Sequence, residues 1–364
     1  MSVSKPLLGL TVGHFGHFDP EYGRNRNVAK ALRRAGALVV DISDRRRFVA
    51  RTPKLAYMGW RGRADVIFVG FPGHSDVPSA KLVARRRRAP VVLDVLTSLW
   101  ETNVIDRRSV PARSLRAYRY WLTDRVALSL ADAVLLDTDA HIAWFQATFG
   151  IPRSKLNRVW VGADDDLMTP CPQARADGAF KVFFYGSFIP LHGIEHVIHA
   201  AERLQKRDED IRFVLCGAGQ TLPAMRRLAS SRHVSNVEFI GRQPAPELHR
   251  LMCESDVCLG IFGTSPKARA VIPNKVFDAL ACARPVITGD TPAVREALTD
   301  GTDSRLCRPG DAEALAEAVL SMRADAAGRA RIAAAGHELF KRRFSTDAIA
   351  TDVAGVVLDV LRAH

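Results

Sequence analysis

The sequence lacks an apolar run long enough to span a bilayer, and Lys5 and Pro6 interrupt the first ten residues, so we expect no secretory signal. Six cysteines occur, but none forms a CxxC pair or stands at zinc-finger spacing from a histidine. We therefore expect neither a disulfide nor a metal site. Together these absences lead us to expect a cytoplasmic protein, at most peripheral at the inner face of the membrane.

Aromatic residues are scarce, at 7% of 364 residues, and there is no RNP-type aromatic strand or helix-turn-helix signature. We therefore expect no nucleic-acid binding, although the net charge is +13. Residues 1–166 contain 27 basic and 16 acidic side chains, whereas the remainder contains 25 and 23. This excess fits an anionic partner, such as a phosphorylated substrate or acidic lipid headgroups, or simply a soluble surface. It is concentrated in arginine clusters: Arg45–Arg47, Arg85–Arg88, Arg107, Arg108, Arg113, Arg116 and Arg119.

A chain of this length suits two domains, and both halves alternate short apolar strands with helical segments. This alternation predicts an α/β fold with parallel sheets covered on both faces. In the first half we predict strands over Leu7–Val12, Ala37–Ile42, Asp65–Gly70, Pro90–Val95, Ala133–Leu136 and Arg158–Val161. Between them we predict a glycine-rich loop over Gly13–Phe18. We predict helices over Asn27–Gly36, Pro78–Arg88, Arg113–Leu130 and His141–Phe149.

A turn-rich, polar stretch, Gly162–Pro172 with a spacer over Ala174–Gly178, separates the two halves. We place the domains at residues 1–168 and 169–346, followed by an amphipathic helix over Asp347–Arg362. The run Asp164–Asp166 is either an acidic surface turn or a carboxylate set for a divalent metal, and its place in a linker favours the turn.

Glycine-rich loops follow the predicted strands of the second half, around Gly186–Gly193, Gly217–Gly219 and Gly241–Gln243. A further segment, Pro273–Asp290 (PNKVFDALACARPVITGD), begins a helix after a proline and places Asp278 one turn inside it. A helix N-terminus suits phosphate, and such an acid can accept hydrogen bonds from sugar hydroxyls. These loops predict a nucleotide site at the carboxyl edge of the sheet, whereas the last segment alone would also fit an ordinary helix–strand unit.

Several stretches of the second half, in order YGSFIPLHGIEHVIHAAERL, FVLCGAGQ, VEFIGRQ, SDVCLGIFG and PNKVFDALACARPVITGD, resemble the donor domain of retaining GT-B glycosyltransferases. The first half fits the same family through GHFDPEYGRNRNVAKALRRAG, VVLDVLTSLWETNVIDRR and ADAVLLDTDAHIAWFQATFGIP. The nearest group is the bacterial family four, or group 1. The resemblance implies two Rossmann-like domains facing across a deep cleft, with the C-terminal helix, 347–364, crossing back to the first domain.

The resemblance also implies an activity: metal-independent transfer of a hexose-type sugar from a nucleotide-diphosphate donor to an acceptor hydroxyl, with retention of configuration and no cofactor. Arg242 and Gln243 would lie beside the base, and Asp278 would contact the ribose. The full set of donor-binding residues that it implies is Gly186, Ser187, His192, Gly193, Gly217, Arg242, Gln243, Pro273, Asn274, Lys275 and Asp278.

The chain departs from the family pattern where the diphosphate is neutralised. Ser187 and His192 stand where many relatives carry arginine and lysine, and the first glutamate of a paired motif is missing between Phe262 and Asp278. A diphosphate leaving group needs positive charge or N–H dipoles aimed at it. We expect that charge to come from one or more of four side chains: Lys275, Lys267, Arg269 and His192.

In the first domain, the resemblance places the Gly13–Phe18 loop over the sugar. Candidate catalytic residues are Asp94, His14 and, from the second domain, Lys275, with Asp94 orienting or deprotonating the acceptor hydroxyl. Candidate acceptor-binding residues are Gly16, His17, Arg24 and Arg26.

The donor would be of the UDP or GDP type, and the acceptor a lipid-linked sugar or a small metabolite, with anionic membrane contact through the basic first domain. Alternatives are a sugar-nucleotide epimerase or hydrolase of the same fold, or a non-catalytic nucleotide-sugar-binding homologue.

Overall fold

The computed structural model describes residues 5–44, 46, 48–171, 178–207 and 210–364. The expectations for Arg45, Arg47 and residues 172–177 of the linker lie outside the described residues. The chain divides into two compact units: unit 1 is Met1–Gly162 with Thr346–His364, and unit 2 is Ala163–Ser345.

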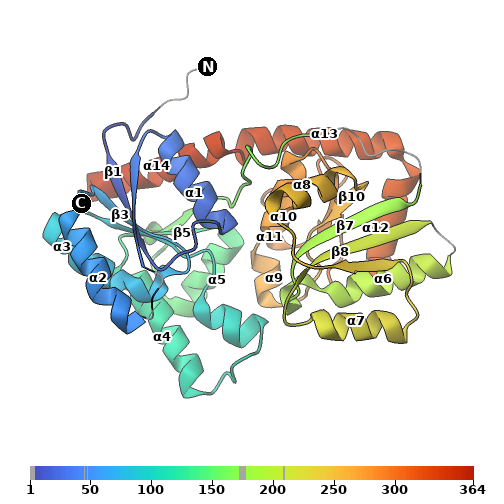
Figure 1. Ribbon diagram of the computed structural model, residues 1–364, viewed down its shortest axis with the longest axis horizontal. Helices are drawn as coiled ribbons and strands as arrows, with labels where there is room; N and C mark the ends of the chain where they lie inside the picture. Colours follow the sequence, from blue (N-terminus) through green and yellow to red (C-terminus); the bar gives the residue numbers. More distant parts are fainter. Residues whose placement is uncertain (1–4, 45, 47, 172–177, 208–209) are drawn as a thin grey trace. The chain divides into compact units, whose positions relative to one another are not determined.

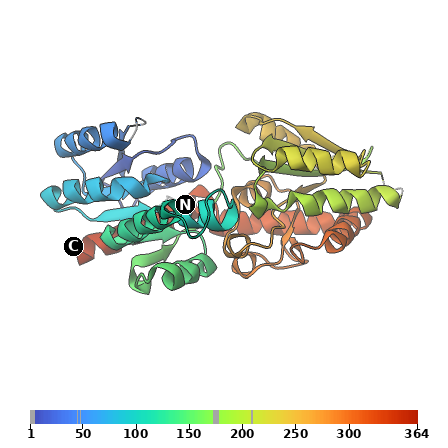
Figure 2. The same cartoon turned by 90° about the horizontal axis from the view of Figure 1, so that it is seen from below.

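Unit 1 is built on a parallel six-stranded sheet in the order β2-β1-β3-β4-β5-β6. Apolar runs such as VIFV and AVLL form its central strands because helices cover both faces (Figures 1 and 2). The strands are β1 (Thr11–Gly16), β2 (Leu38–Ser43), β3 (Val66–Val69), β4 (Val91–Asp94), β5 (Ala133–Leu136) and β6 (Leu156–Arg158). The helices are α1 (Gly23–Arg34), α2 (Phe48–Arg61), α3 (Val77–Arg87), α4 (Leu115–Leu130), α5 (Asp139–Phe149) and α14 (Thr346–Ala363).

Unit 2 repeats the plan with a parallel sheet in the order β12-β11-β10-β7-β8-β9. Its strands are β7 (Phe180–Ser187), β8 (Ile211–Ala218), β9 (Val237–Ile240), β10 (Val257–Leu259), β11 (Val286–Gly289) and β12 (Arg305–Cys307). Its helices are α6 (Ile194–Lys206), α7 (Leu222–Ser231), α8 (Ala245–Cys253), α9 (Pro266–Ala270), α10 (Asn274–Ala281), α11 (Pro292–Arg295), α12 (Ala312–Ala324) and α13 (Ala326–Arg343).

The last helix, α14, belongs to unit 1 although the chain reaches it from unit 2. It packs against α1, and Figure 1 shows the two helices side by side. Ile349, Val353 and Val357 recur at helical spacing and are buried, which explains why this amphipathic run docks on the sheet domain.

Two strand predictions in unit 1 are wrong. The last strand runs over Leu156–Arg158 rather than Arg158–Val161. The first strand runs over Thr11–Gly16 rather than Leu7–Val12, so Gly13, His14 and Gly16 lie in β1 and not in a loop. Gly13 fits a strand because a Cβ there would lie 3.1 Å from both Ala64 and Ile42. Helix α2, which contains Pro53, was not predicted from the sequence.

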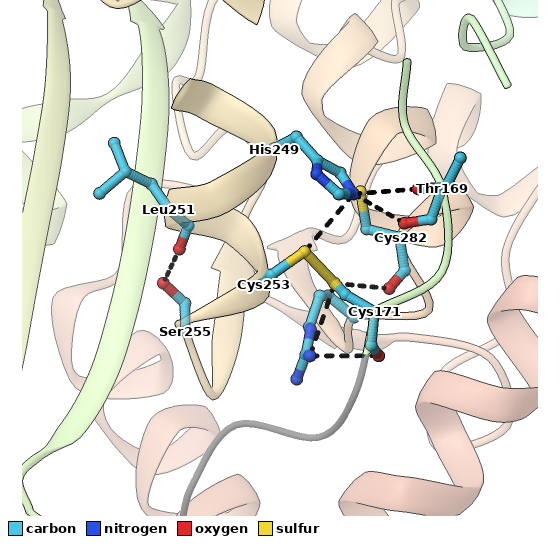
Figure 3. Close-up of a disulfide and its surroundings, with 8 residues drawn as sticks. Thr169, Cys171, His249, Leu251, Cys253, Ser255 and Cys282 are labelled. Carbon is cyan, nitrogen blue, oxygen red and sulfur yellow. Dashed lines mark hydrogen bonds between the residues drawn. A yellow bond between two sulfur atoms is a disulfide. The ribbon is translucent and has the colours of Figure 1, made fainter. Parts of the chain in front are cut away.

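The expectation that no disulfide forms is also wrong. Cys171 and Cys253 are joined, with their Cα atoms 5.6 Å apart and a sequence separation of 82 positions (Figure 3). No local spacing signals this pair, because only the fold brings the segment before 172 beside the end of α8. The other four cysteines are free and buried.

A charged histidine lies in the interior of unit 1, at the start of α5. His141 Nδ1 is 2.7 Å from an Asp137 carboxylate oxygen, and Nε2 is 3.3 Å from Glu101. Burial alone would lower the pKa of His141, but the Glu101 and Asp137 carboxylates outweigh it and raise the pKa from 6.5 to about 9. The His141 imidazolium therefore joins the start of α5 to Asp137, directly after β5, and to Glu101.

This cluster predicts a pH-dependent stability of unit 1. Because the folded-state pKa of His141 lies above the unfolded value of 6.5, its contribution is complete below that pH and is lost as the pH rises through about 9. The loss should be up to roughly 3 kcal/mol. All five tryptophans lie in residues 60–160, so tryptophan fluorescence during urea unfolding reports on unit 1 alone.

His141→Gln should be less stable than the parent at pH 6 and should approach it near pH 9, since the variant has no imidazolium to titrate. A stability gap that stays constant between these pH values would contradict the assignment of the charge to His141.

Candidate functional site

Two glycines at the carboxyl ends of adjacent strands bring the backbone of unit 2 close together. Gly186 of β7 and Gly217 of β8 are paired in register, with φ of +151° and +140°. A Cβ on Gly217 would overlap the carbonyl oxygen of Gly186, and a Cβ on Gly186 would lie 3.1 Å from His192 and 3.2 Å from Lys275. The absence of a side chain at Gly186 therefore leaves room for His192 and Lys275 at the sheet edge, and its absence at Gly217 lets the two strand ends approach each other.

Lys275 and His192 form the centre of the candidate site. Lys275, in the first turn of α10, donates a hydrogen bond from Nζ to Nε2 of His192 over 3.2 Å, and both side chains are buried. Burial lowers the pKa of Lys275 to about 7, although Asp278 opposes the shift. Burial and the charge of Lys275 lower the pKa of His192 well below its usual value, so this imidazole is neutral and accepts the bond.

Asp278 lies one turn further along α10 and faces β7. Its carboxylate accepts a hydrogen bond from the hydroxyl of Tyr185, and burial together with Asp278 raises the pKa of that tyrosine well above its usual value. The sequence analysis missed Tyr185. Its only signal was its place at the end of an apolar strand, directly before Gly186.

The remaining residues predicted for donor binding lie at the end of β7 and the loop after it, on the loop after β9, and at the start of α10. Ser187 and Arg242 are exposed, whereas Gln243, Pro273 and Asn274 are half-buried. Gly193 has φ of +62° and packs against the backbone of Phe262 and Gly263. Among the described residues, no side chain caps the N-terminus of α10 at Pro273.

Of the other candidates for a neutralising charge, Lys267 is buried on α9 and Arg269 is exposed. The charge of Lys267 contributes to the lowered pKa of His192, which places Lys267 within electrostatic reach of the same imidazole. The structure therefore gathers Lys275, His192 and Lys267, and leaves Arg269 outside the buried group.

In unit 1, Arg24 and Asp94 are paired with each other in the interior. The Arg24 guanidinium donates to both carboxylate oxygens of Asp94 at 2.9–3.1 Å, and to the carbonyl oxygens of Val159 and Trp160. Arg24 and Asp94 are 0% and 1% exposed. Arg24, which we expected to face an acceptor, is therefore not accessible to one, and both carboxylate oxygens of Asp94 already accept hydrogen bonds.

The two histidines of the predicted first loop are held differently. His14 is buried within β1, with Nδ1 3.1 Å from Asp41 and its ring stacked on Phe18. His17 is half-buried, and its backbone N–H donates to Asp76. Gly16 is buried against Asp76, and Arg26 donates to the Glu21 carbonyl oxygen.

The acidic run in the predicted linker forms a turn. Asp164 is buried and accepts a hydrogen bond from the backbone N–H of Asp166 over 3.2 Å. An aspartate that accepts a hydrogen bond from the N–H two residues later is typical of a turn.

Residues 179–325 match the family described as "Glycosyl transferases group 1". The chain is 23% identical to an alpha-D-kanosaminyltransferase of Streptomyces kanamyceticus, over 77% of this chain and 73% of that protein. It is 27% identical to a GDP-mannose-dependent alpha-(1-6)-phosphatidylinositol monomannoside mannosyltransferase of Mycolicibacterium smegmatis, over 57% of this chain and 56% of that protein.

Two solved structures share the architecture. Sucrose-phosphate synthase of Thermosynechococcus elongatus has a TM-score of 0.74 at 18% identity, covering 97% of this chain and 99% of that one. Anabaena HepE, solved in complex with UDP-glucose, has a TM-score of 0.73 at 17% identity, covering 96% and 100%. These likenesses confirm the predicted GT-B fold.

Because β7 and β8 approach closely, adding one methyl group at Gly217 should strongly reduce the stability of unit 2. Gly217→Ala should destabilise unit 2 by on the order of 3 kcal/mol, because the new Cβ overlaps the Gly186 carbonyl oxygen and the backbone has positive φ. Gly241→Ala is the matched control, since a Cβ there meets nothing within 4 Å and should change stability by less than about 0.5 kcal/mol.

Hydrogen exchange of the β7 and β8 amides measures both variants in the intact chain. Equal exchange in the two variants would show that the two strand ends are not in tight contact.

Proposed function

We propose that this chain moves a hexose-type sugar from a nucleotide-diphosphate donor to an acceptor hydroxyl with retention of configuration. The chain is a GT-B glycosyltransferase, and its unit 2 carries a group 1 glycosyltransferase domain. The observation that carries the proposal is the buried Lys275 ammonium beside a neutral His192, at the glycine-lined edge of the unit 2 sheet. A diphosphate is a ligand whose charge suits such a desolvated cation.

In this proposal the bond between the sugar C1 and the diphosphate oxygen breaks, and the acceptor oxygen bonds to C1 on the same face. The acceptor proton passes to the leaving phosphate oxygen, so the products are the nucleoside diphosphate and the glycoside. Lys275, Lys267 and the N–H groups at the start of α10 would stabilise the negative charge that develops on the leaving group. With these cations in place, the transfer needs neither a metal nor a cofactor.

Asp278 would accept hydrogen bonds from the donor ribose, held in orientation by the Tyr185 hydroxyl. Arg242 and Gln243, on the loop after β9, would lie beside the base, which we expect to be uracil or guanine. The mannosyltransferase relative is named for GDP-mannose and HepE binds UDP-glucose, so relatives support both bases.

On the acceptor side, His14, Gly16, His17 and Arg26 remain candidates for the acceptor or the sugar. Asp94 accepts three guanidinium hydrogen bonds over its two oxygens and could take a proton only by losing at least one of them, so we assign the Arg24–Asp94 pair to positioning the Val159–Trp160 segment. The proton then moves directly between acceptor and leaving group.

A lipid-linked acceptor is supported by the surface of α4. Leu115, Tyr118, Leu122 and Val126 are exposed at helical spacing, forming one apolar stripe, and arginines flank it at Arg116, Arg119 and Arg125. This pattern is typical of a helix that lies in an anionic membrane interface. Within the described residues, each helix is too short or too polar to cross a bilayer.

Lys275 makes donor binding depend on pH. Its pKa in the unoccupied site is about 7, so binding of an anionic diphosphate requires proton uptake above that pH, and affinity should fall by up to about tenfold per pH unit. Titration calorimetry with intact UDP- and GDP-sugars tests this between about pH 6 and pH 9. Their diphosphate is esterified at both ends and keeps a constant charge over this range.

Lys275→Arg should remove the pH dependence, because guanidinium stays charged, and Lys275→Met should lose most of the affinity. Lys206→Met, an exposed lysine of α6, is the control and should match the parent. Binding that is independent of pH, or unchanged in Lys275→Met, would refute the diphosphate site. Product analysis with donor alone separates transfer from the alternatives, since an epimerase or hydrolase needs no acceptor and a binding homologue gives no turnover.

The α4 stripe predicts association with anionic vesicles. The chain should co-sediment with phosphatidylglycerol vesicles and much less with phosphatidylcholine vesicles, and Arg116→Glu/Arg119→Glu should weaken binding at least about tenfold. Arg212→Glu/Arg227→Glu, an equal charge change at exposed positions of unit 2, should have little effect. Equal loss in both double variants would indicate attraction by net charge rather than docking through α4.

A further inference from the structure

Two cysteines and a histidine of unit 2 converge on one point away from the Lys275 site. Cys171 and Cys253 form the disulfide, and Nε2 of His249 lies 3.5 Å from the Cys253 sulfur. Figure 3 shows His249 directed from α8 toward the sulfur pair, with Thr169 on the facing segment. The two sulfurs and a ring nitrogen all lie within 4.8 Å of one another.

The local sequence explains this convergence. His249 and Cys253 are four residues apart on α8, so both side chains emerge from the same face of the helix, one turn apart. Cys171 reaches that face from the segment that precedes residue 172. All three residues are half-buried, so solvent ions can reach them.

The surroundings favour thiolates and a metal-binding imidazole. The Arg284 guanidinium lies 3.5 Å from the Cys171 sulfur, and a neighbouring cation stabilises the ionised form of a thiol. Nε2 of His249 donates a hydrogen bond to the Thr169 carbonyl oxygen over 2.9 Å in the disulfide form, so binding a metal there requires the ring proton to move to Nδ1 and frees that carbonyl oxygen beside the three side chains.

The donor set and its spacing fit zinc. Zinc bonds of about 2.3 Å to sulfur and about 2.0–2.1 Å to nitrogen place tetrahedral ligand atoms about 3.5 Å apart. The Cys253 sulfur and the His249 nitrogen already have this separation. Two thiolates and one imidazole also form a known three-ligand set that leaves a fourth position for water or another oxygen.

We propose that Cys171, His249 and Cys253 bind a zinc ion when the disulfide is reduced, and that the disulfide is the oxidised, metal-free form of the same site. Reduction by a phosphine or dithiol breaks the S–S bond with two electrons and two protons and gives two thiols. Zinc binding then displaces two protons from those thiols. The sequence analysis expected no metal site because no local spacing connects residues 171 and 249.

Such an ion would fasten the segment before residue 172 to α8. It would also lie near the end of α10, since the Cys171 sulfur is 3.4 Å from the Cys282 carbonyl oxygen. The site makes no contact with Lys275 in this assignment, so the proposal stands independently of the proposed transfer reaction.

Cobalt is the probe, because Co²⁺ occupies zinc sites and is coloured. The full chain, reduced with a phosphine under nitrogen, should bind one Co²⁺, with tetrahedral visible bands and a sulfur-to-cobalt band, and zinc should displace it. Cys253→Ser and His249→Ala should each weaken binding by more than about a hundredfold. Cys307→Ala, a buried cysteine of β12 elsewhere in unit 2, is the control and should bind like the parent.

The chain kept oxidised should bind no cobalt at this site. An absence of tetrahedral cobalt bands in the reduced parent, or bands that persist in Cys253→Ser, would overturn the proposal. If a ligand variant does not fold, the parent alone decides the matter, because zinc should raise its melting temperature after reduction and leave the oxidised chain unchanged.

Discussion

The buried ammonium of Lys275 is the constraint on which the candidate site depends. Removing a lysine from water disfavours its charge, and this is why its pKa falls to about 7. The site tolerates the lysine because His192 is neutral and accepts its hydrogen bond, and because Gly186 has no side chain to occupy the same space. An anionic diphosphate would stabilise the charged form of Lys275, as water does for an exposed lysine. Burial of Lys275 therefore destabilises the empty site but favours the binding of an anionic ligand.

Unit 1 handles buried charge in the opposite way. Arg24 is matched by Asp94 and two carbonyl oxygens, and His141 by Asp137 and Glu101, so each cation is satisfied within the unit. These pairs fix the ends of β4 and β5, and neither cation is left to neutralise the charge of a ligand. The contrast supports an assignment in which unit 2 binds the charged donor and unit 1 offers a shaped surface, with arginines along the outer face of α4.

Much of the fold followed from the sequence, because parallel strands buried on both faces give short apolar runs. Ala133–Leu136 has the predicted bounds, and β3 and β4 lie within the predicted Asp65–Gly70 and Pro90–Val95. The position of β1 did not follow, since Gly13 and Gly16 resemble a loop until their neighbours are known. In the site, Lys275 and His192 were named, but Tyr185 lies within an apolar strand and gave no polar pattern. The partnership of Arg24 with Asp94 and that of Cys171 with Cys253 join residues 70 and 82 positions apart, which only tertiary structure can reveal.

The most direct test of the central claim is a crystal structure of the chain with a bound nucleotide diphosphate sugar. The proposed donor site requires diphosphate oxygens within hydrogen-bonding distance of Lys275 Nζ and the backbone at Gly186, with the ribose hydroxyls at Asp278. A nucleotide bound elsewhere, or a diphosphate without contact to Lys275, would contradict it.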